Sequence, residues 1–432
     1  MGNRIASLDE GVGFGGFSGR VVSGRECMLP GNRRVFVAGY AQSPFGKLGA
    51  MKVEEAIRLA AREAAAAAGV PLEAVETASV AGLLAPLLQD QTLLAGLLAM
   101  EPAMAGKPIE TVENACASGG QAVLTVVRRL LLGEADVGLA VGIEKMRDDE
   151  GKADGKLLGK VLGTASHLEE RPGKVFVFPH IFAEVQAAYM AHWGVTEEQL
   201  AHVAVTFYAH GNHNPLAQMQ KVEMTVEKVM TLEGPNRYIA EGLPLKTFEC
   251  SQMSDGWAGL VLATEEGMRR LGIPASRAVE LVGFGQATDP LSTRGRDVLH
   301  PAGAYRAMQA AYRMAGITAA DVGVAEVHDC FGIMGALAVE ILGLAEPGQG
   351  ARYFVEGHAR VDGGKVPINT SGGLIAKGHP IGATGVAMIG WNSWQLLGRT
   401  PEALRVPGAR YAASFNIGGP ICASVTTVLK AP

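Results

Sequence analysis

Residues 368–385 read INTSGGLIAKGHPIGATG, and this stretch decides how the second half of the chain folds. Its five glycines surround His379, which Pro380 follows directly. Glycine is used where the backbone needs a positive φ or lies close to another segment, and proline suits the first turn of a helix. We therefore predict a tight loop that holds His379 at the start of a buried helix of small residues.

The composition indicates an enzyme with a large interior. The chain has 432 residues, of which 48% are hydrophobic and 19% are charged, and its 57 glycines suit an α/β protein with many tight turns. A formal net charge of −5 without a basic block argues against nucleic acid as a partner. No run of 18 apolar residues occurs, so we expect no membrane span.

The cysteines indicate a reducing, cytoplasmic location. They stand at positions 27, 116, 250, 330 and 422, and none belongs to a C-x-x-C pair. An odd number of widely spaced cysteines is typical of reduced thiols. Residues 1–33 contain no apolar central run, so we predict an irregular N-terminal arm there and not a signal peptide.

Short apolar runs alternate with helical patterns along the first third of the chain. Residues 35–40, 80–84 and 137–141 are typical of buried strands, and a helical pattern ends at Gly69. This alternation predicts a parallel sheet with helices on its faces. Residues 148–249 differ, because they hold charge clusters and most of the histidines. We interpret them as an inserted subdomain.

The last third of the chain repeats the pattern of the first. A helical segment ends at Gly69 in one copy and at Gly316 in the other. Each is followed by an apolar strand pattern, at residues 80–84 and 324–327 respectively. An internal repeat of this kind predicts two similar α/β halves packed as a pseudo-dimer.

Residues capable of chemistry occur in four loops at predicted strand ends. Cys116 precedes a helix rich in small residues, where the helix dipole and free N–H groups would lower the pKa of the thiol. The sequence HDCF at residues 328–331 ends one predicted strand, and NIGG at residues 416–419 ends another. Ligands bind at strand ends in open α/β sheets. Together with the His379 loop, these segments predict one site.

These motifs resemble those of the thiolase family. Cys116 with Ser118 resembles the family's C-x-S nucleophile loop, and residues 378–380 resemble its G-H-P loop. The chain carries HDCF at residues 328–331 where most thiolases carry N-E-A-F, and Asn416 where they carry cysteine. Both differences are similar to the sterol-carrier-protein type of thiolase.

The resemblance covers residues 34–430 and implies the thiolase fold, in which two similar βαβαβ-type halves form five layers, α-β-α-β-α. The N-terminal half would span residues 34–289, with the loop subdomain inserted at about 148–249, and the C-terminal half residues 290–432. The family also implies a homodimer or a dimer of dimers, a role in fatty-acid and lipid metabolism, and a lipid-carrier protein as a candidate partner.

The resemblance further implies a role for each site residue. Cys116 would carry the acyl group, His379 would take the proton from Cys116, and Cys330 would be the second acid/base. One oxyanion hole would come from the side chains of His328 and His379, and the other from the N–H groups of Cys116 and Gly418. Ser118 and Asn416 would support these groups, and Met253, Ser371 and Gly372 would bind substrate.

Three functions remain open at this point. The leading one is a CoA-dependent acyltransferase that cleaves 3-oxoacyl-CoA or runs the reverse Claisen condensation, with CoA and acyl-CoA as substrates and no permanent cofactor. A decarboxylating ketoacyl synthase could use the same cysteine and histidines, although it needs no second thiol such as Cys330. A non-catalytic acyl-CoA- or lipid-binding subunit needs none of them. His210 and His213 have no evident third ligand, so we expect no metal.

Overall fold

The computed structural model describes residues 33–432. The predicted N-terminal arm at residues 1–33 therefore lies outside the described residues, except for its last position, and so does Cys27. Within the described range, no helix combines the length and the apolar character needed to cross a membrane.

The strands of the described range form one hydrogen-bonded sheet in the order β3-β2-β4-β5-β1-β6-β9-β8-β7. They are β1 Val35–Gln42, β2 Thr77–Ala81, β3 Ile109–Val112, β4 Val137–Glu144, β5 Gly256–Thr264, β6 Val279–Thr288, β7 Val322–Val327, β8 Tyr411–Gly418 and β9 Ala423–Lys430. In the middle of this order, β1 pairs with β6 only at Phe36 and Val37. The sheet therefore consists of two half-sheets that are joined only by this short pairing of β1 with β6.

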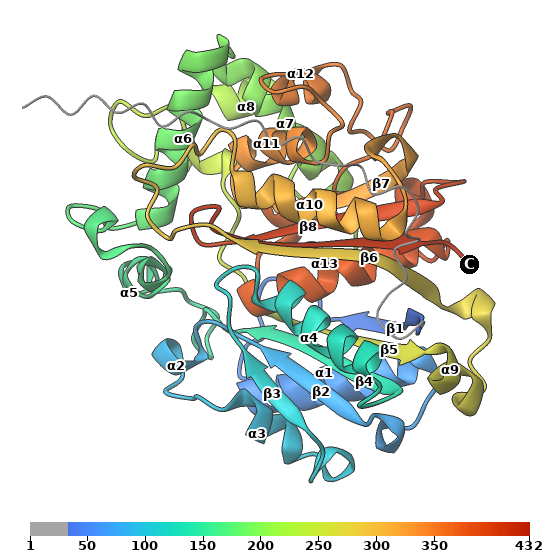
Figure 1. Cartoon of the computed structure of the whole chain (residues 1–432). Coiled ribbons are helices and arrows are strands. Elements are labelled where there is room, and N and C mark those ends of the chain that lie inside the picture. Colours follow the sequence, from blue (N-terminus) through green and yellow to red (C-terminus); the bar gives the residue numbers. More distant parts are fainter. Residues whose placement is uncertain (1–32) are drawn as a thin grey trace, which may run out of the picture.

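The helices place these half-sheets in five layers, as the sequence predicted (Figure 1). The outer layers are α1 (Val53–Ala68), which packs on β1 and β5, and α10 (Ala302–Ala315), which packs on β6 and β9. The central layer holds α4 (Ser118–Leu132) and α13 (Ile381–Leu396), which pack on each other between the half-sheets. Almost every residue of α13 is buried, as its small-residue sequence predicted.

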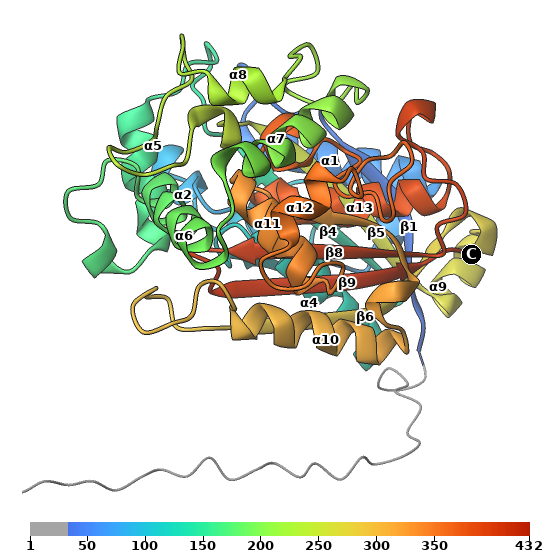
Figure 2. The same ribbon diagram turned by 90° about the horizontal axis from the view of Figure 1, so that it is seen from above.

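The remaining helices lie around this core. They are α2 Ala85–Leu88, α3 Leu94–Ala99, α5 Gly155–Leu162, α6 Val177–Trp193, α7 Glu197–Asn212, α8 Val226–Met230, α9 Glu265–Leu271, α11 Gly332–Ile341 and α12 Gly350–Val355. Helices α5 to α8 all come from residues 148–249, and α7 packs on α11 and α12 of the second half (Figure 2). This segment contains helices and loops but no strand, in keeping with the predicted insertion.

The predicted repeat is visible in both halves. Helices α1 and α10 end at Gly69 and Gly316, which adopt φ values of 75° and 66°, the left-handed conformation that favours glycine. Each helix lies on a strand glycine that leaves no room for a side chain. A Cβ atom on Gly259 of β5 would lie 2.4 Å from the carbonyl oxygen of Ala60, and one on Gly285 of β6 would lie 1.9 Å from that of Ala307.

Two predictions about strands were wrong. Only β2–β3, β2–β4 and β7–β8 pair in parallel, whereas the central strands pair antiparallel. The turn that joins β8 to β9 spans only residues 419–422, and so short a connection requires antiparallel pairing. The strand predicted at residues 80–84 is β2 at Thr77–Ala81, because the N–H groups of Leu83 and Leu84 donate to the carboxylate of Glu144 and not to a neighbouring strand.

The central helices touch at glycines close to their N-termini. A Cβ atom on Gly385 of α13 would lie 2.1 Å from the backbone nitrogen of Gly120 in α4 and 2.3 Å from Oδ1 of Asn416. One on Gly142 of β4 would lie 2.1 Å from the carbonyl oxygen of Gly382. Backbone therefore packs directly on backbone where the two predicted reactive loops meet the core.

This contact makes Gly385→Ala a test of the packing. The added methyl group would collide with backbone and not with a flexible side chain, so we expect the free energy of unfolding to fall by about 1–3 kcal/mol. Gly96→Ala in α3 is the matched control, since its Cβ would meet only the Leu93 side chain at 3.4 Å. That change should leave stability equal or raise it by about 0.5–1 kcal/mol. Denaturant unfolding of both variants measures the difference, and equal effects would contradict this account of the central layer.

Candidate active site

The loop that carries Cys116 lies between β3 and α4 and has a strained backbone. Ala115 adopts φ 48°, a left-handed conformation that is uncommon for a residue other than glycine. The Ser118 hydroxyl holds the turn, because it donates to the carbonyl oxygen of Ala115 at 2.6 Å and accepts from the N–H of Asn114 at 2.8 Å. Ser118 is thus placed to support the loop, as predicted, while Cys116 stays partly exposed at its tip.

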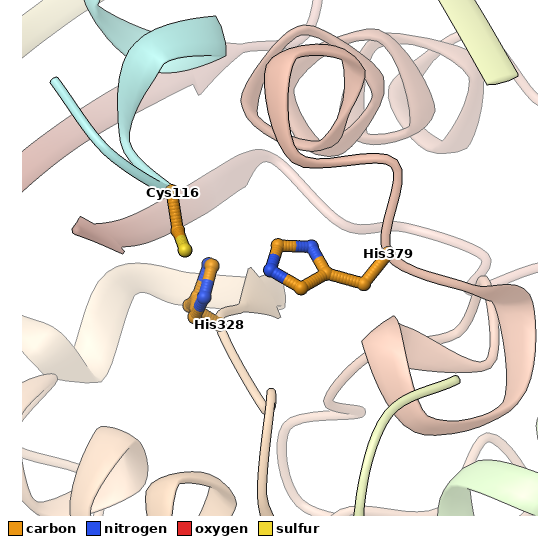
Figure 3. A group of neighbouring side chains, drawn as sticks. All are labelled: Cys116, His328 and His379. Carbon is orange, nitrogen blue, oxygen red and sulfur yellow. The ribbon is translucent and has the colours of Figure 1, made fainter. Parts of the chain in front are cut away.

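Two histidines face Cys116 from the second half of the chain (Figure 3). His328 follows β7, and His379 follows the π-helical turn Gly373–Lys377 and precedes α13. Their rings lie edge to face, with centroids 5.0 Å apart. The sulfur of Cys116 and one nitrogen of each ring all lie within 4.8 Å of one another. The structure therefore brings together three of the four residues predicted to be catalytic.

The hydrogen bonds of His379 define its tautomer. Its Nδ1 lies 2.8 Å from the hydroxyl oxygen of Thr384, and that hydroxyl lies 2.9 Å from the carbonyl oxygen of Pro380. A carbonyl only accepts, so the Thr384 hydroxyl gives its proton to Pro380 and accepts from Nδ1–H of His379. The Nε2 atom, which has no hydrogen-bond partner among the described residues, is left with a free lone pair.

Asn416, in β8, lies between the nucleophile loop and His328. Its Nδ2 is 3.0 Å from the carbonyl oxygen of Cys116 and 3.0 Å from Nδ1 of His328. Its Oδ1 accepts from the N–H of Gly120 at 3.3 Å. One amide group therefore contacts the nucleophile loop, the start of α4 and a site histidine.

The charge state of the site differs from the prediction. The pKa of the Cys116 thiol is raised to about 12, chiefly by burial and also by the nearby Glu144, while the N–H of Gly419 acts to lower it. The predicted fall of this pKa was wrong, because Cys116 precedes α4 by two residues and desolvation exceeds the effect of the helix end. Burial also lowers the pKa of His379 to about 3 and lowers that of His328. The resting site is neutral.

Two buried carboxylates fix the loops of the site: Glu144, which sequence analysis missed, and Asp329, which it noted only as part of HDCF. Glu144 ends β4 and accepts from the N–H groups of Leu83, Leu84 and Gly382. Asp329 follows His328 and accepts from the N–H groups of Leu374 and Ile375 and from the side chain of Asn369. Burial raises the pKa of each carboxyl to about 7. In the sequence, these carboxylates could have been recognised by their position at the end of an apolar strand pattern.

Two further thiols lie near Cys116. Cys330 and Cys422 are both buried, and burial raises the pKa of each. The nearby Cys116 also raises the pKa of Cys330, and the nearby Cys422 also raises the pKa of Cys116. The predicted role of Cys330 as second acid/base stays a prediction, and so does the oxyanion-hole role of the Gly418 N–H. The neighbouring Gly419 N–H faces the sulfur of Cys116, which the sequence did not indicate.

The residues predicted to bind substrate fall into two groups. Met253 packs against the same apolar cluster as Cys116. Ser371 is fully buried and its hydroxyl donates to Glu326 at 2.5 Å, while Gly372 adopts φ 99° and packs on Gly211. The contact of Ser371 and Gly372 with substrate stays a prediction.

The histidines considered for metal binding have other roles. Nδ1 of His210 contacts the carbonyl oxygen of Asn369 at 3.1 Å, and its Nε2 accepts from the N–H of Val361 at 3.3 Å. Both ring nitrogens are thus used within the protein, and burial lowers the pKa of His210 to about 4. His213 caps the end of α7.

Comparison with known proteins agrees with this fold. The family model described as "Thiolase, N-terminal domain" matches residues 35–266, and the one described as "Thiolase C-terminal domain-like" matches residues 285–431. An acetyl-CoA acetyltransferase of Methanothermobacter thermautotrophicus is 34% identical over 388 residues, covering 90% of this chain and 97% of that protein. Human sterol carrier protein 2 is 33% identical over 399 residues, covering 89% and 70%.

A solved structure described as the Ltp2–ChsH2(DUF35) aldolase superposes with a TM-score of 0.76 at 21% identity, covering 93% of this chain and 98% of that chain. This likeness concerns the fold alone. The family models and the relatives carry the classification: the chain belongs to the thiolase family. It is a CoA-dependent acyltransferase of thiolase type.

The high pKa of Cys116 predicts slow alkylation of the resting enzyme. Iodoacetamide reacts with the thiolate, and below a pKa of about 12 the thiolate fraction rises about tenfold per pH unit. The alkylation rate should therefore climb steadily from pH 7 to pH 10 without a plateau, as mass spectrometry of the Cys116 peptide can measure. The matching peptide of Cys116→Ala gives the background. A plateau below pH 9 would show that the thiolate already exists in the resting site.

Proposed function

We propose that the protein transfers an acyl group between Cys116 and CoA, cleaving 3-oxoacyl-CoA or condensing an acyl-CoA with acetyl-CoA. The observation that carries this proposal is the cluster of Cys116 Sγ with two buried imidazoles within 4.8 Å. The free lone pair of His379 Nε2 suits a base, because it can take a proton from the thiol at the moment of attack. An acyl-enzyme on Cys116 is the proposed intermediate.

In the direction of cleavage, the first half-reaction breaks the carbon–carbon bond. The sulfur of Cys116 attacks the 3-oxo carbonyl while its proton passes to His379, and His328 donates a hydrogen bond to the oxygen. Collapse of the adduct leaves an acyl thioester on Cys116 and releases the enolate of acetyl-CoA. Cys330, whose raised pKa keeps it protonated, gives its proton to the α-carbon. Proton transfer from His379 to Cys330 restores both groups.

The second half-reaction returns the acyl group to CoA. The thiol of CoA gives its proton to His379 and attacks the thioester carbon. The sulfur of Cys116 leaves and recovers its proton from His379. All bonds and protons balance over the two steps, and no permanently bound cofactor or metal is required.

An apolar cluster beside Cys116 is the proposed site of the acyl group. Its buried members are Leu84, Met146, Leu158, Val161 and Ile381, and Leu83, Leu88, Ala153, Leu162 and Met253 pack at its margin. Three of these residues, Leu88, Met146 and Leu158, also line a cavity of about 520 Å³ whose other lining residues are mostly charged. An apolar wall next to the sulfur and a polar one farther out suit an acyl chain joined to CoA.

The other two functions are less well supported. A decarboxylating ketoacyl synthase would leave Cys330 without a role, although it is held close to Cys116. A non-catalytic binder would not need a free lone pair on His379 Nε2 beside the thiol of Cys116. The acetyl-CoA acetyltransferase relative also favours transfer chemistry.

The assembly and location are proposals of the same kind. We propose a homodimer or a dimer of dimers, supported by the edge position of β3 in the sheet and by Leu93 and Met100 beside it, which are 67% and 55% exposed. Sedimentation of the purified chain measures the oligomeric state.

The free state of Cys116, Cys250 and Cys330 supports a cytoplasmic location. A lipid-carrier protein stays a candidate partner.

A panel of 3-oxoacyl-CoA substrates of increasing chain length tests the proposed reaction. We expect CoA-dependent loss of the 3-oxoacyl thioester and formation of acetyl-CoA. Brief incubation without free CoA should add an acyl mass to the Cys116 peptide. Cys116→Ala should abolish both signals while the unfolding curve stays close to that of the wild type. Turnover that survives in this variant would sink the proposal.

The two neighbouring thiols can be told apart by substitution. If Cys330 protonates the α-carbon, Cys330→Ala should lower kcat by about 10²-fold or more, the range expected for lost general acid catalysis. Transfer of an acyl group from acyl-CoA to Cys116 should persist. Cys422→Ala is the matched control, because it removes an equally buried thiol and should cost only stability. Equal, mild effects on kcat would remove Cys330 from the mechanism.

A further inference from the structure

We propose that Asn416 is a positioning residue that keeps the proton of His328 on Nε2, so that the two site histidines hold opposite tautomers. This inference deepens the proposed function and rests on it for its catalytic meaning. It follows from three hydrogen bonds of one buried amide and from the fixed polarity of the backbone groups that contact it.

Backbone groups that cannot change their polarity determine how the Asn416 amide points. Its oxygen faces the N–H of Gly120, and its nitrogen faces the carbonyl oxygen of Cys116. The reverse orientation would set two donors against each other at Gly120 and two acceptors at Cys116. The contact with Gly120 is buried and the one with Cys116 is partly buried, and an unsatisfied polar group in such a place is costly. The NH₂ group of Asn416 must therefore face Cys116 O.

The same NH₂ group also reaches His328. One of its protons goes to Cys116 O, and the other points at Nδ1 of His328 at 3.0 Å. Nδ1 can accept this bond only as an unprotonated nitrogen, so the proton of the neutral ring resides on Nε2. Burial and the proximity of His379 lower the pKa of His328, which keeps the ring neutral. Its Nε2 has no partner among the described residues and lies in the reactive cluster.

The two histidines are thereby prepared for different tasks. Thr384 places the proton of His379 on Nδ1, so its Nε2 accepts. Asn416 places the proton of His328 on Nε2, so its Nε2 donates. A thiol that gives up its proton and a carbonyl oxygen that gains charge need one group of each kind. The two histidines thus differ in function because their Nδ1 atoms have different hydrogen-bond partners.

The same arrangement determines how the cluster responds to a metal ion. A sulfur and two imidazoles within 4.8 Å could supply three ligands to a tetrahedral ion, but a metal needs the lone pair of Nε2 on each ring. His328 could free that lone pair only by moving its proton to Nδ1, against the NH₂ group of Asn416. A carboxylate at position 416 would instead accept from Nδ1–H and favour metal binding, as carboxylate partners of histidine ligands do.

The first experiment needs no variant of Asn416 and no turnover. Protein labelled with ¹⁵N-histidine is examined at neutral pH by two-bond ¹H–¹⁵N correlation spectra, with His328→Gln and His379→Gln used for assignment. We expect His328 to carry its proton on Nε2 and His379 on Nδ1. A His328 ring protonated on Nδ1, or an equal mixture of tautomers, would overturn the proposal.

The second experiment uses Asn416→Asp and cobalt(II) as a spectroscopic probe. The new oxygen accepts from Nδ1–H of His328, so Nε2 should lose its proton in the spectra. Cobalt(II) should then bind at least about tenfold more tightly than to the wild type, the lower end of the effect of such partners, with sulfur-to-cobalt absorption that disappears when Cys116→Ala is added. Wild-type affinity in this variant would count against the proposal.

Asn392→Asp is the matched control. This residue of α13 is also buried, and its Nδ2 likewise donates to a backbone oxygen of β8, that of Ala413, at 2.8 Å. It contacts neither histidine, so it should change neither tautomers nor cobalt affinity. For turnover, Asn416→Asp should lower kcat about 10²–10³-fold, as for a lost oxyanion donor, with little change in KM. An unchanged kcat would show that Asn416 has no role in catalysis.

The readouts separate the two proposals. If the protein cleaves no 3-oxoacyl-CoA yet shows the expected tautomers and cobalt response, the proposed function fails and the role of Asn416 stands. If cleavage occurs but His328 carries its proton on Nδ1, the reverse holds. Should Asn416→Asp fail to fold, the wild-type spectra alone still decide whether the tautomers are opposite, and Asn416→Ala should then show a mixture at His328.

Discussion

The contact between the N-terminal turns of α4 and α13 is the constraint on which the candidate site depends. Gly120 and Gly385 meet backbone to backbone there, and neither position has room for a Cβ atom. Because Cys116 lies just before α4 and His379 just before α13, this contact sets the separation of the two residues. Small residues in the central layer therefore serve the chemistry as much as the packing.

The two halves of the chain supply different residues to the site. The first half supplies Cys116, and the second supplies both histidines and Asn416. Few strand contacts join the two half-sheets, since β1 and β6 pair at only two positions. The site is instead held by polar groups that reach across: Asn416 binds the Cys116 loop, and Glu144 of β4 binds the N–H of Gly382 at the start of α13.

The sequence predicted most of the parts of this site. The glycines and Pro380 around His379 are local signals, and local signals also marked Cys116 and the HDCF segment. The repeat around Gly69 and Gly316 predicted the two halves, because a left-handed helix end requires glycine wherever it occurs. These features depend on residues close in sequence, which is why a pattern can reveal them.

What the sequence could not provide depends on groups far apart in the chain. Glu144 joins N–H groups about 60 and 238 positions away, and no local pattern announces such partners. The pKa of Cys116 was predicted to fall from its place before a helix, yet burial by distant segments raises it. The antiparallel centre of the sheet likewise depends on how the segments around residues 148–249 return to the core.

The neutral resting site also bears on oxidative damage. Peroxides attack thiolates and hardly react with protonated thiols, and Cys116 is protonated at neutral pH because burial raises its pKa. His379 cannot form an ion pair with it at rest, since burial keeps the imidazole neutral. A raised pKa at Cys116 thus favours slow reaction of the resting thiol with peroxides. In the proposed reaction, Cys116 would be a thiolate, and so open to oxidation, only after its sulfur has left the acyl group and before it has regained its proton.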